Sequence, residues 1–370
     1  MSGRRSAVEA LDAFGPQVAP FIDGYLAGWR PYKPAWSYED GCIYKGLLDL
    51  AEALGDRACF DFVRREVASR VAPNGAIPGF DPQEYNIDNV NGGKALIRLL
   101  KQGGEPRLRR AIDAQHAQLE THPRTKSGNY WHKKIYPRQV WLDGLYMAQP
   151  FRCAYAALAD RPGIRADVLA QFAAVEHFMR DPATGLYYHG WDESRAERWS
   201  DPATGCSPNF WGRSLGWYMM ALVDCVELLA GDAEPLASQL RSLAHALLKI
   251  RGSAGLWWQV PDQPGRERNY EEVSASLMIA YALMKGARLG ALPQASAVPG
   301  RDTLQAVIRR FLGVQALGGI CGVAGLGGDP YRDGSYEYYV SEPLAANDPK
   351  GVGALLMALA EAVRRPDATS

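Results

Sequence analysis

The stretch Gly128-Asn129-Tyr130-Trp131 returns twice later in the chain, as Gly185-Leu186-Tyr187-Tyr188 and as Gly255-Leu256-Trp257-Trp258. Each copy is a glycine-led aromatic loop between segments in which apolar residues have helical spacing. One sixth of the 370 residues is about 62, close to the length of two helices of about 12–16 residues with their connections. The repeat therefore predicts an all-α fold built from six helical hairpins.

The apolar spacing of amphipathic helices occurs in about a dozen segments. They are residues 6–14, 43–54, 58–70, 92–102, 106–119, 144–159, 165–180, 213–230, 235–250, 273–289, 302–315 and 350–364. The first helix of each later pair is the less charged one, so it is expected to line the inside of a ring. No Ser/Gly linker and no block of like charges divides the chain. We therefore expect one domain over residues 1–370, an (α/α)6 toroid whose inner helices begin near Gly92, Gly144, Ser214, Val273 and Lys350.

The composition is that of a packed globular protein without a charge surplus, with 41 Lys+Arg, 41 Asp+Glu and 47% hydrophobic residues. A net charge of zero predicts neither nucleic acid nor a membrane surface as a partner. The longest uncharged apolar stretch, residues 273–284, is shorter than the roughly 20 residues that span a bilayer. Glu9, Asp12 and Pro16 interrupt any apolar core of a signal peptide. We expect a cytoplasmic protein, and the sequence leaves its oligomeric state open.

The cysteine and histidine spacings do not predict a metal site. The six cysteines contain no Cys-x-x-Cys pair, and the six histidines show no His-x-x-x-His spacing. In a chain long enough to build its own core, such scattered cysteines are expected to be buried thiols. We expect an activity that needs neither a metal nor a cofactor.

Asp143, in Val140-Trp141-Leu142-Asp143-Gly144, is the strongest candidate for acid chemistry. An Asp just before a helix is also a good N-cap, so a capping role is the alternative. Asp88 occupies the equivalent entrance one repeat earlier, and the loops that enter the inner helices meet at one mouth of the ring. Two carboxylates in one cavity push their pKa values apart, which leaves one protonated near neutrality as a general acid. We predict that Asp143 and Asp88 form a catalytic pair, although a helix N-terminus favours the ionised form.

Arg213 lies between Trp211 and Trp217 in the next inner-helix entrance. An arginine of this kind either stacks on the aromatics for packing or forks onto a substrate carboxylate. Indole rings in the mouth of a toroid suit the apolar face of a pyranose. Together with the carboxylates, this group predicts a pocket for an acidic saccharide.

Three further polar residues lie in aromatic loops where a substrate contact is plausible. His189 follows Tyr187-Tyr188, and His132 and Lys133 follow Tyr130-Trp131. Each signal is weak alone, and the other four histidines have neither aromatic nor acidic neighbours in sequence. We therefore add His189, His132, Lys133 and Trp141 to the predicted substrate site.

Long blocks around these residues carry a family resemblance. Residues 130–148 (YWHKKIYPRQVWLDGLYMA), 181–192, 211–218, 272–276, 336–343 and 347–353 resemble the unsaturated rhamnogalacturonyl hydrolases, glycoside hydrolase family 105. The blocks extend over most of the chain, which makes the resemblance far more specific than a short motif. It also implies the (α/α)6 fold that the helix pairs predict.

The resemblance implies removal of a 4,5-unsaturated uronic acid from the non-reducing end of oligosaccharides that a polysaccharide lyase produces. The substrate expected from it is unsaturated galacturonyl-rhamnose. In this family an acid protonates C4 of the vinyl ether, water adds at C5, and the hemiketal opens to release the saccharide. Asp143 matches the acid/base and Asp88 the second carboxylate. Arg213, His189, Lys133, Trp141, Trp211 and Trp217 fall on substrate-lining positions.

Asp40, in the block Trp36-Ser37-Tyr38-Glu39-Asp40, stands where the family pattern has an uncharged polar residue. An added anion near the mouth leaves the preference for the next sugar open. Unsaturated glucuronyl units of ulvan or of glycosaminoglycans remain an alternative substrate. Two other classes compete with hydrolysis: a non-catalytic sugar-binding toroid, which retention of both carboxylates disfavours, and a sugar epimerase, for which only His189 and His132 are available.

Overall fold

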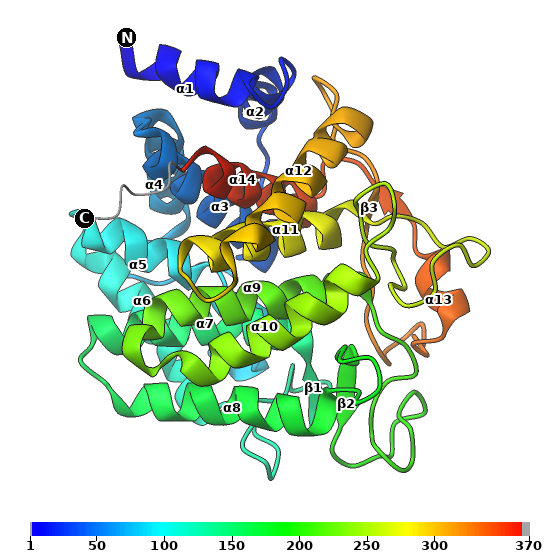
Figure 1. Cartoon of the computed structure of the whole chain (residues 1–370). Helices are drawn as coiled ribbons and strands as arrows, with labels where there is room; N and C mark the ends of the chain where they lie inside the picture. The colour runs from blue at the N-terminus through cyan, green and yellow to red at the C-terminus, as the bar shows by residue number, and fades with distance from the viewer. Residues whose placement is uncertain (1, 365–370) are drawn as a thin grey trace.

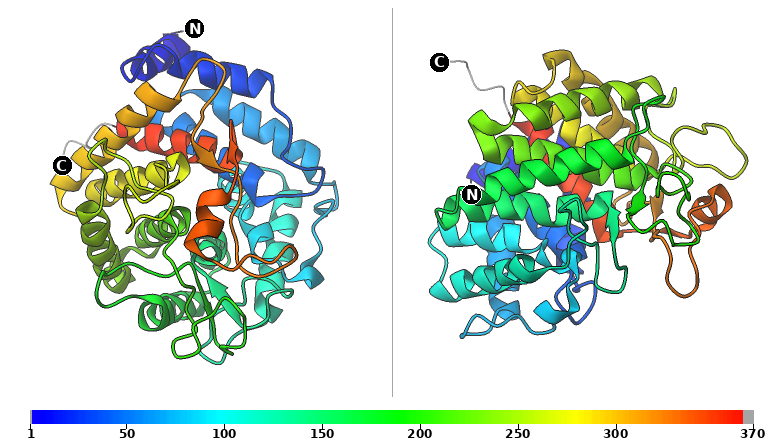
Figure 2. Two further views of the ribbon diagram at one scale, coloured as in Figure 1. Left: turned by 90° about the vertical axis from the view of Figure 1, so that its right-hand side faces the viewer. Right: turned by 90° about the horizontal axis from the view of Figure 1, so that it is seen from below.

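Six buried helices form a closed ring at the centre of the molecule. The computed structural model describes residues 2–364, so residue 1 and residues 365–370 of the predicted domain lie outside the described residues. Each helix of the ring contacts the next, and the last contacts the first (Figures 1 and 2). The ring consists of α3 (Tyr38–Leu54), α5 (Gly93–Lys101), α7 (Leu142–Leu158), α9 (Gly212–Leu229), α11 (Val273–Arg288) and α14 (Pro349–Val363). The predicted toroid is therefore confirmed, including its closure.

A second layer of helices packs outside this ring. Five outer helices each follow an inner helix and contact it. They are α4 (Arg57–Arg70), α6 (Pro106–Thr121), α8 (Gly163–Met179), α10 (Glu234–Lys249) and α12 (Ala297–Phe311). Because each outer helix returns the chain to its starting side, the inner helices run parallel and begin at the same end of the ring.

The sixth hairpin joins the two ends of the chain. α1 (Ser2–Asp12) contacts both α14 and α3, and it is followed by α2 (Val18–Ala27). The sequence pattern predicts the first of these helices and misses the second. Pro20 and Gly24 lie inside α2, and both residue types lower helix propensity. The burial of Phe21 and Ile22 against the core outweighs that cost.

Side-chain caps fix the starts of several helices. Ser37 accepts a hydrogen bond from the backbone N–H of Asp40 at the start of α3, and Asp56 caps α4 in the same way. The Glu272 carboxylate accepts from Ser274 and Ala275 at the start of α11, while Asp348 caps α14. Such caps satisfy N–H groups that have no partner inside the helix.

Short elements shape the loops at the end of the ring where the inner helices begin, on the right of Figure 1. β1 (Gln139–Trp141) pairs antiparallel with β2 (Gly190–Asp192), with Val140 opposite Trp191. β3 (Ile320–Cys321) pairs with β4 (Leu344–Ala345) in the same sense. α13 (Tyr336–Ser341) and the 3₁₀ turns η1 (Pro82–Glu84) and η2 (Ile87–Val90) belong to the same set of loops, whereas the turns η3 (Ala230–Asp232) and η4 (Gln294–Ser296) follow the ends of α9 and α11. Strands of two or three residues are too short for an alternating pattern to reveal them.

Glycines allow α3 and α14 to approach closely where the ring closes. A Cβ atom added at Gly46 would lie 2.9 Å from the carbonyl oxygen of Gly353, and one at Gly353 would lie 2.8 Å from the backbone of Cys42. Both distances are shorter than van der Waals contact. A larger residue at either position would force the two helices apart.

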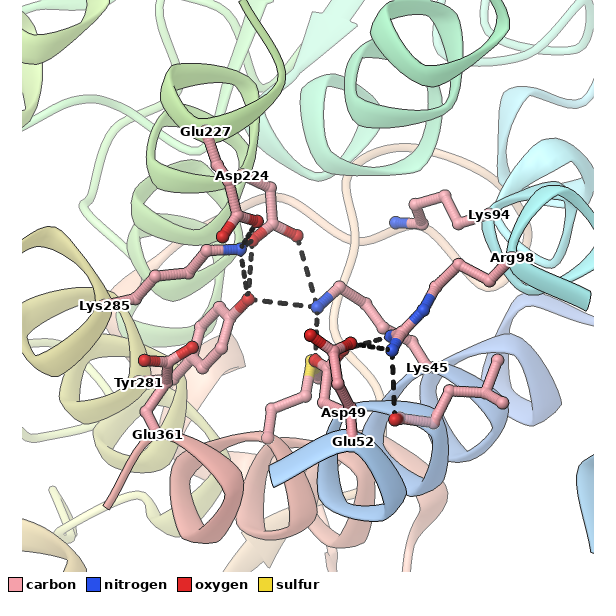
Figure 3. A network of polar contacts seen from close by, with 12 residues as sticks. Lys45, Asp49, Glu52, Lys94, Arg98, Asp224, Glu227, Tyr281, Lys285 and Glu361 are labelled. Carbon is pink, nitrogen blue, oxygen red and sulfur yellow. Dashed lines mark hydrogen bonds and ion pairs between the residues drawn. The ribbon is translucent and has the colours of Figure 1, made fainter. Parts of the chain in front are cut away.

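Charged side chains fill the opposite end of the ring, where the inner helices end (Figure 3). Lys285 Nζ lies 2.7 Å from Asp224 Oδ1 and 2.7 Å from Glu227 Oε2. Similar pairs link Lys45 with Asp49, Arg98 with Asp49, and Arg288 with Glu361. Buried charges persist where an opposite charge and further hydrogen bonds compensate them, as in this network.

Lys94 lies beside that network with a different environment. Its amine donates to the backbone carbonyl of Tyr146 at 3.1 Å and lies 3.4 Å from the centre of the Tyr146 ring. Among the described residues, no carboxylate lies within ion-pair distance of this amine. Burial lowers the pKa of Lys94 to about 7.

Within residues 2–364, one helix is long and apolar enough to cross a membrane by length and composition, namely α9 with the turn that follows it, Gly212–Asp232. It is an inner helix of the ring, and 78% of its most apolar window is buried inside the protein. Core helices of globular proteins have this character.

Candidate active site

Three of the predicted site residues lie where inner helices begin. Asp88 lies in η2 just before α5, Asp143 is the second residue of α7, and Arg213 is the second residue of α9. The N-cap residue of α7 is Trp141, and no side-chain cap hydrogen bond is made there. The alternative that Asp143 caps its helix is therefore wrong, because β1 delivers the chain so that Trp141 occupies the cap position.

Asp88 is a charged carboxylate held by a lysine. Lys133 Nζ lies 2.7 Å from Asp88 Oδ2, and His132 Nε2 lies 3.8 Å from Asp88 Oδ1. Burial by itself would raise the pKa of Asp88, but the Lys133 ammonium outweighs it and lowers this pKa below its usual value. The sequence placed Lys133 among the substrate ligands, whereas its ammonium is already paired with Asp88.

Asp143 has the opposite electrostatic environment. Burial, assisted by the negative charge of Asp88, raises the pKa of Asp143 to about 7, and the positive charge of Arg213 opposes this only in part. Asp143 Oδ2 is buried and has no hydrogen-bond partner among the described residues. The two carboxylates of this mouth thus have pKa values far apart, with Asp143 able to hold a proton near neutral pH.

The two predicted site histidines are both neutral. Burial lowers the pKa of His132 to about 3 in spite of the neighbouring Asp88. Burial also lowers the pKa of His189 well below its usual value. His189 Nε2 lies 3.6 Å from Asp143 Oδ2, and His189 Nδ1 lies 2.7 Å from the hydroxyl of Tyr339. Each carboxylate of the pair therefore has one uncharged imidazole beside it.

The three predicted tryptophans are placed differently. Trp141 stacks on His132 with ring centres 4.3 Å apart and meets His189 edge to face at 5.4 Å. Trp211 lies 4.7 Å from the His189 ring. Trp217 instead stacks on Tyr146 in the main apolar core, one helical turn deeper along α9. Trp141 and Trp211 thus border the carboxylate pair, whereas Trp217 packs behind them.

Arg213 is buried and partly committed to the protein. Its Nη1 donates to the carbonyl of Cys321 and, at 3.4 Å, to Ser274 Oγ, while the guanidinium lies 4.8 Å from the Trp211 ring. Its Nη2 makes only a 3.4 Å bond, to the carbonyl of Gly322, and its Nε has no partner among the described residues. The edge of the guanidinium formed by Nε and Nη2 is therefore the edge that could bind a carboxylate through two parallel hydrogen bonds.

Asp40 is buried at the start of α3 and held by neighbouring groups. Its Oδ1 accepts from the backbone N–H of Tyr32 at 2.9 Å, and its Oδ2 lies 3.7 Å from Arg70 Nη2. The Asp40 side chain thus anchors the loop before α3.

Two residues near the carboxylates were not selected from the sequence. Glu39 is buried, and its Oε2 has no hydrogen-bond partner among the described residues but lies 3.8 Å from Lys33 Nζ. Successive residues on a helix point in different directions, so Glu39 faces the site while Asp40 turns away. Tyr339, on α13, reaches His189 across 150 residues of sequence. The only available signal for Tyr339 was its position in the aromatic block 336–343.

Metal and thiol chemistry have no candidates in the part of the chain that the structure describes. No group of three or more His, Cys, Asp or Glu side chains there could hold a metal ion. The six cysteines are buried free thiols.

Comparisons with known proteins identify the family. A family model described as Glycosyl Hydrolase Family 88 matches residues 24–366. A solved glycoside hydrolase of family 105 from C. acetobutylicum ATCC 824 is 40% identical, with a TM-score of 0.89 and coverage of 93% of this chain and 98% of that chain. The unsaturated rhamnogalacturonyl hydrolase YesR of Bacillus subtilis is 28% identical over 264 residues, 69% of this chain and 72% of its own length. The unsaturated glucuronyl hydrolase of Bacillus sp. GL1 shares only the fold, with 16% identity, a TM-score of 0.66 and coverage of 96% and 95% of the two chains.

These findings make the protein a glycoside hydrolase that acts on oligosaccharides. The chain belongs to the unsaturated glycuronyl hydrolases of families 88 and 105, and its resemblance to family 105 is confirmed.

Proposed function

We propose that this enzyme removes a 4,5-unsaturated galacturonic acid from rhamnose at the non-reducing end of lyase-generated oligosaccharides. The observation that carries the proposal is the buried pair in which Asp143 has a pKa near 7 while Asp88 is held charged by Lys133. A group whose pKa lies near the working pH is suited to both giving and taking a proton. The similarity to YesR, an unsaturated rhamnogalacturonyl hydrolase by name, supports the choice of sugar.

The reaction proceeds by hydration of the vinyl ether. Asp143 gives its proton to C4 of the C4=C5 double bond, which leaves a cation at C5 that the ring oxygen stabilises. Water adds to C5 and returns a proton to the Asp143 carboxylate. The resulting hemiketal opens to a ketone at C5, and the former ring oxygen stays on C1, where the hemiacetal collapses and releases the saccharide. The sum is one water added and one saccharide released.

Asp88 has an electrostatic part in this scheme. Its negative charge helps to keep Asp143 protonated before the proton moves to carbon. The same charge stabilises the cation that then forms on the sugar ring. Lys133 keeps Asp88 ionised and prevents the pair from sharing one proton.

Arg213 supplies recognition of the uronate. The edge formed by Nε and Nη2 takes the C6 carboxylate, while the Nη1 bond to Cys321 fixes the guanidinium. Trp141 and Trp211 pack against His132 and His189, which lie beside the two carboxylates where the sugar ring would bind. Trp217 supports these residues from the core.

The unsaturated glucuronyl units of ulvan or of glycosaminoglycans are the second candidate substrates. The named activity of the Bacillus sp. GL1 protein favours them, and that protein shares only the fold.

A substrate panel tests the proposal. The protein is incubated with lyase-generated oligosaccharides from rhamnogalacturonan, ulvan and chondroitin, and loss of the ultraviolet absorbance of the conjugated double bond is followed. We expect the highest kcat/KM on unsaturated galacturonyl-rhamnose. Faster turnover of an ulvan or chondroitin product would transfer the assignment to that substrate, and no absorbance loss on any of the three would refute it.

A further inference from the structure

The hydrogen bond between Tyr339 and His189 lies directly behind the proposed acid. The Tyr339 hydroxyl is 2.7 Å from His189 Nδ1, and the other ring nitrogen, Nε2, is 3.6 Å from Asp143 Oδ2. All three side chains are largely buried, with exposed side-chain fractions of 0% for His189 and 14% for Asp143. Three groups from three separate parts of the chain, α13, the segment before β2, and α7, therefore form one line that ends at Asp143.

The direction of the Tyr339 hydrogen bond follows from the surroundings of its hydroxyl. Tyr339 is 0% exposed, and among the described residues His189 Nδ1 is the only hydrogen-bond partner of its hydroxyl. A buried O–H without an acceptor is costly, at roughly 1–3 kcal/mol. The hydroxyl therefore donates its proton to Nδ1, and Nδ1 is the nitrogen that carries a lone pair.

The position of the imidazole proton follows in turn. His189 is neutral, since burial and the nearby His132, Arg332 and Arg213 all disfavour its charged form. A neutral imidazole has one N–H and one lone pair. With the lone pair on Nδ1, the hydrogen is on Nε2 and points toward Asp143. Both Nε2 and Asp143 Oδ2 are buried without a hydrogen-bond partner among the described residues, so a movement of a few tenths of an ångström would join them.

We propose that Tyr339 is a positioning residue that fixes His189 as the Nε2–H tautomer and so makes His189 a hydrogen-bond donor to Asp143. The proposal deepens the proposed function, because it assumes that Asp143 gives a proton to carbon. It concerns His189 itself, however, and the tautomer is measurable without substrate.

The tautomer decides which way the proton of Asp143 moves. With hydrogen on Nε2, His189 cannot take that proton, and its N–H stabilises the carboxylate that remains after C4 is protonated. With hydrogen on Nδ1, the Nε2 lone pair would face Asp143 and bind its acidic proton, which would hold that proton away from the sugar. Tyr339 thus favours transfer to carbon over transfer to nitrogen.

Nitrogen-15 NMR of the histidine side chains tests the tautomer directly. Protein labelled with ¹⁵N-histidine is measured at pH 6, where Asp143 is largely protonated, and the His189 signal is assigned with a His189→Gln variant. We expect wild type to show the Nε2–H tautomer. In Tyr339→Phe, which keeps the ring that stacks on Trp211, we expect the Nδ1–H tautomer to dominate because Asp143 then donates to Nε2.

Tyr338→Phe is the matched control on the same short helix. The Tyr338 hydroxyl accepts from the backbone N–H of Gly325 at 3.0 Å, so the change removes one tyrosine hydroxyl from α13 without touching the His189 bond. His189 should keep its Nε2–H tautomer in this variant. Nδ1–H in wild type, or an unchanged tautomer in Tyr339→Phe, would overturn the proposal even if the enzyme hydrolyses its substrate as expected.

Kinetics provide a second readout that a packing role would not produce. We expect kcat of Tyr339→Phe to fall about tenfold or more with KM within about twofold of wild type, because Tyr339 itself makes none of the proposed sugar contacts while proton delivery is impaired. Tyr338→Phe should stay close to wild type in both constants. A Tyr339→Phe defect confined to KM would assign Tyr339 to substrate binding and overturn the positioning role.

Discussion

Replacing Asp88 with Asn should move the upper pH limit of activity downward. In wild type the proposed acid must be protonated, so kcat/KM falls as pH rises through the Asp143 pKa of about 7. The Asp88 charge is the second cause of that raised pKa, after burial. Its removal makes Asp143 easier to ionise, and a neighbouring charge is worth about 1 unit or more. The protonated fraction at pH 7 then drops from about one half to about one tenth, a roughly fivefold loss from this effect alone.

The pH profile of kcat/KM from pH 4.5 to 9 provides the assay. At pH 5 both proteins hold Asp143 almost fully protonated, so the part of the Asp88→Asn defect that comes from the pKa should vanish there. Lys133→Met is the matched control, for which we expect the basic limb of the pH profile to shift in the opposite direction. Lys133 lowers the pKa of Asp143, so its removal should move the same limb upward. If the basic limb stays in place in both variants, the electrostatic account of the pair is refuted.

Three other changes have defined outcomes. Asp143→Asn should fold normally by circular dichroism and lose about two to four orders of magnitude in kcat, and more than a tenth of wild-type activity would exclude Asp143 as the acid. Arg213→Ala should lose about 30-fold to several thousand-fold in kcat/KM on the acid substrate but little on its methyl ester. Arg213→Lys should also be impaired on the acid, because lysine lacks the planar fork. Equal losses on acid and ester would make Arg213 a packing residue. Lys94→Met should raise the free energy of unfolding at pH 7 by about 1–4 kcal/mol, because the folded protein holds Lys94 with a pKa of about 7 while the unfolded chain holds it near 10.5. That penalty is complete below pH 7 and disappears as pH rises toward 10.5, so the difference between the two proteins in urea unfolding should shrink at pH 9.5; a constant difference would contradict it.

The helical ring is predictable from sequence because it depends on local patterns. Apolar periodicity and the low charge of the inner helices identify most of the elements and their order. The pattern fails where the chain uses residues of low helix propensity inside a helix. α2 contains Pro20 and Gly24, and α12 begins at Ala297 with Pro299 and Gly300 in its first turn, five residues before the predicted start. Tertiary burial decides such segments, and a single sequence does not display it.

The sequence predicts a site residue only where the position of that residue along the chain determines which way its side chain points. Asp88 and Asp143 are found because equivalent loop positions repeat. Trp217 was grouped with Arg213 because it follows Arg213 closely in the same aromatic segment, yet α9 runs inward and Trp217 packs in the core. Tyr339 contacts His189 from a distant segment, and no local pattern encodes such a contact.

The proton that reaches C4 tests the central claim most directly. The enzyme is given its unsaturated disaccharide in D₂O, and the products are followed by NMR from the earliest time points. The account predicts one deuterium at C4 and one double bond lost for each saccharide released, with both signals lost together in Asp143→Asn. Release of the saccharide with the C4=C5 double bond intact and no deuterium at C4 would mean ordinary cleavage at the glycosidic oxygen, and would contradict the account.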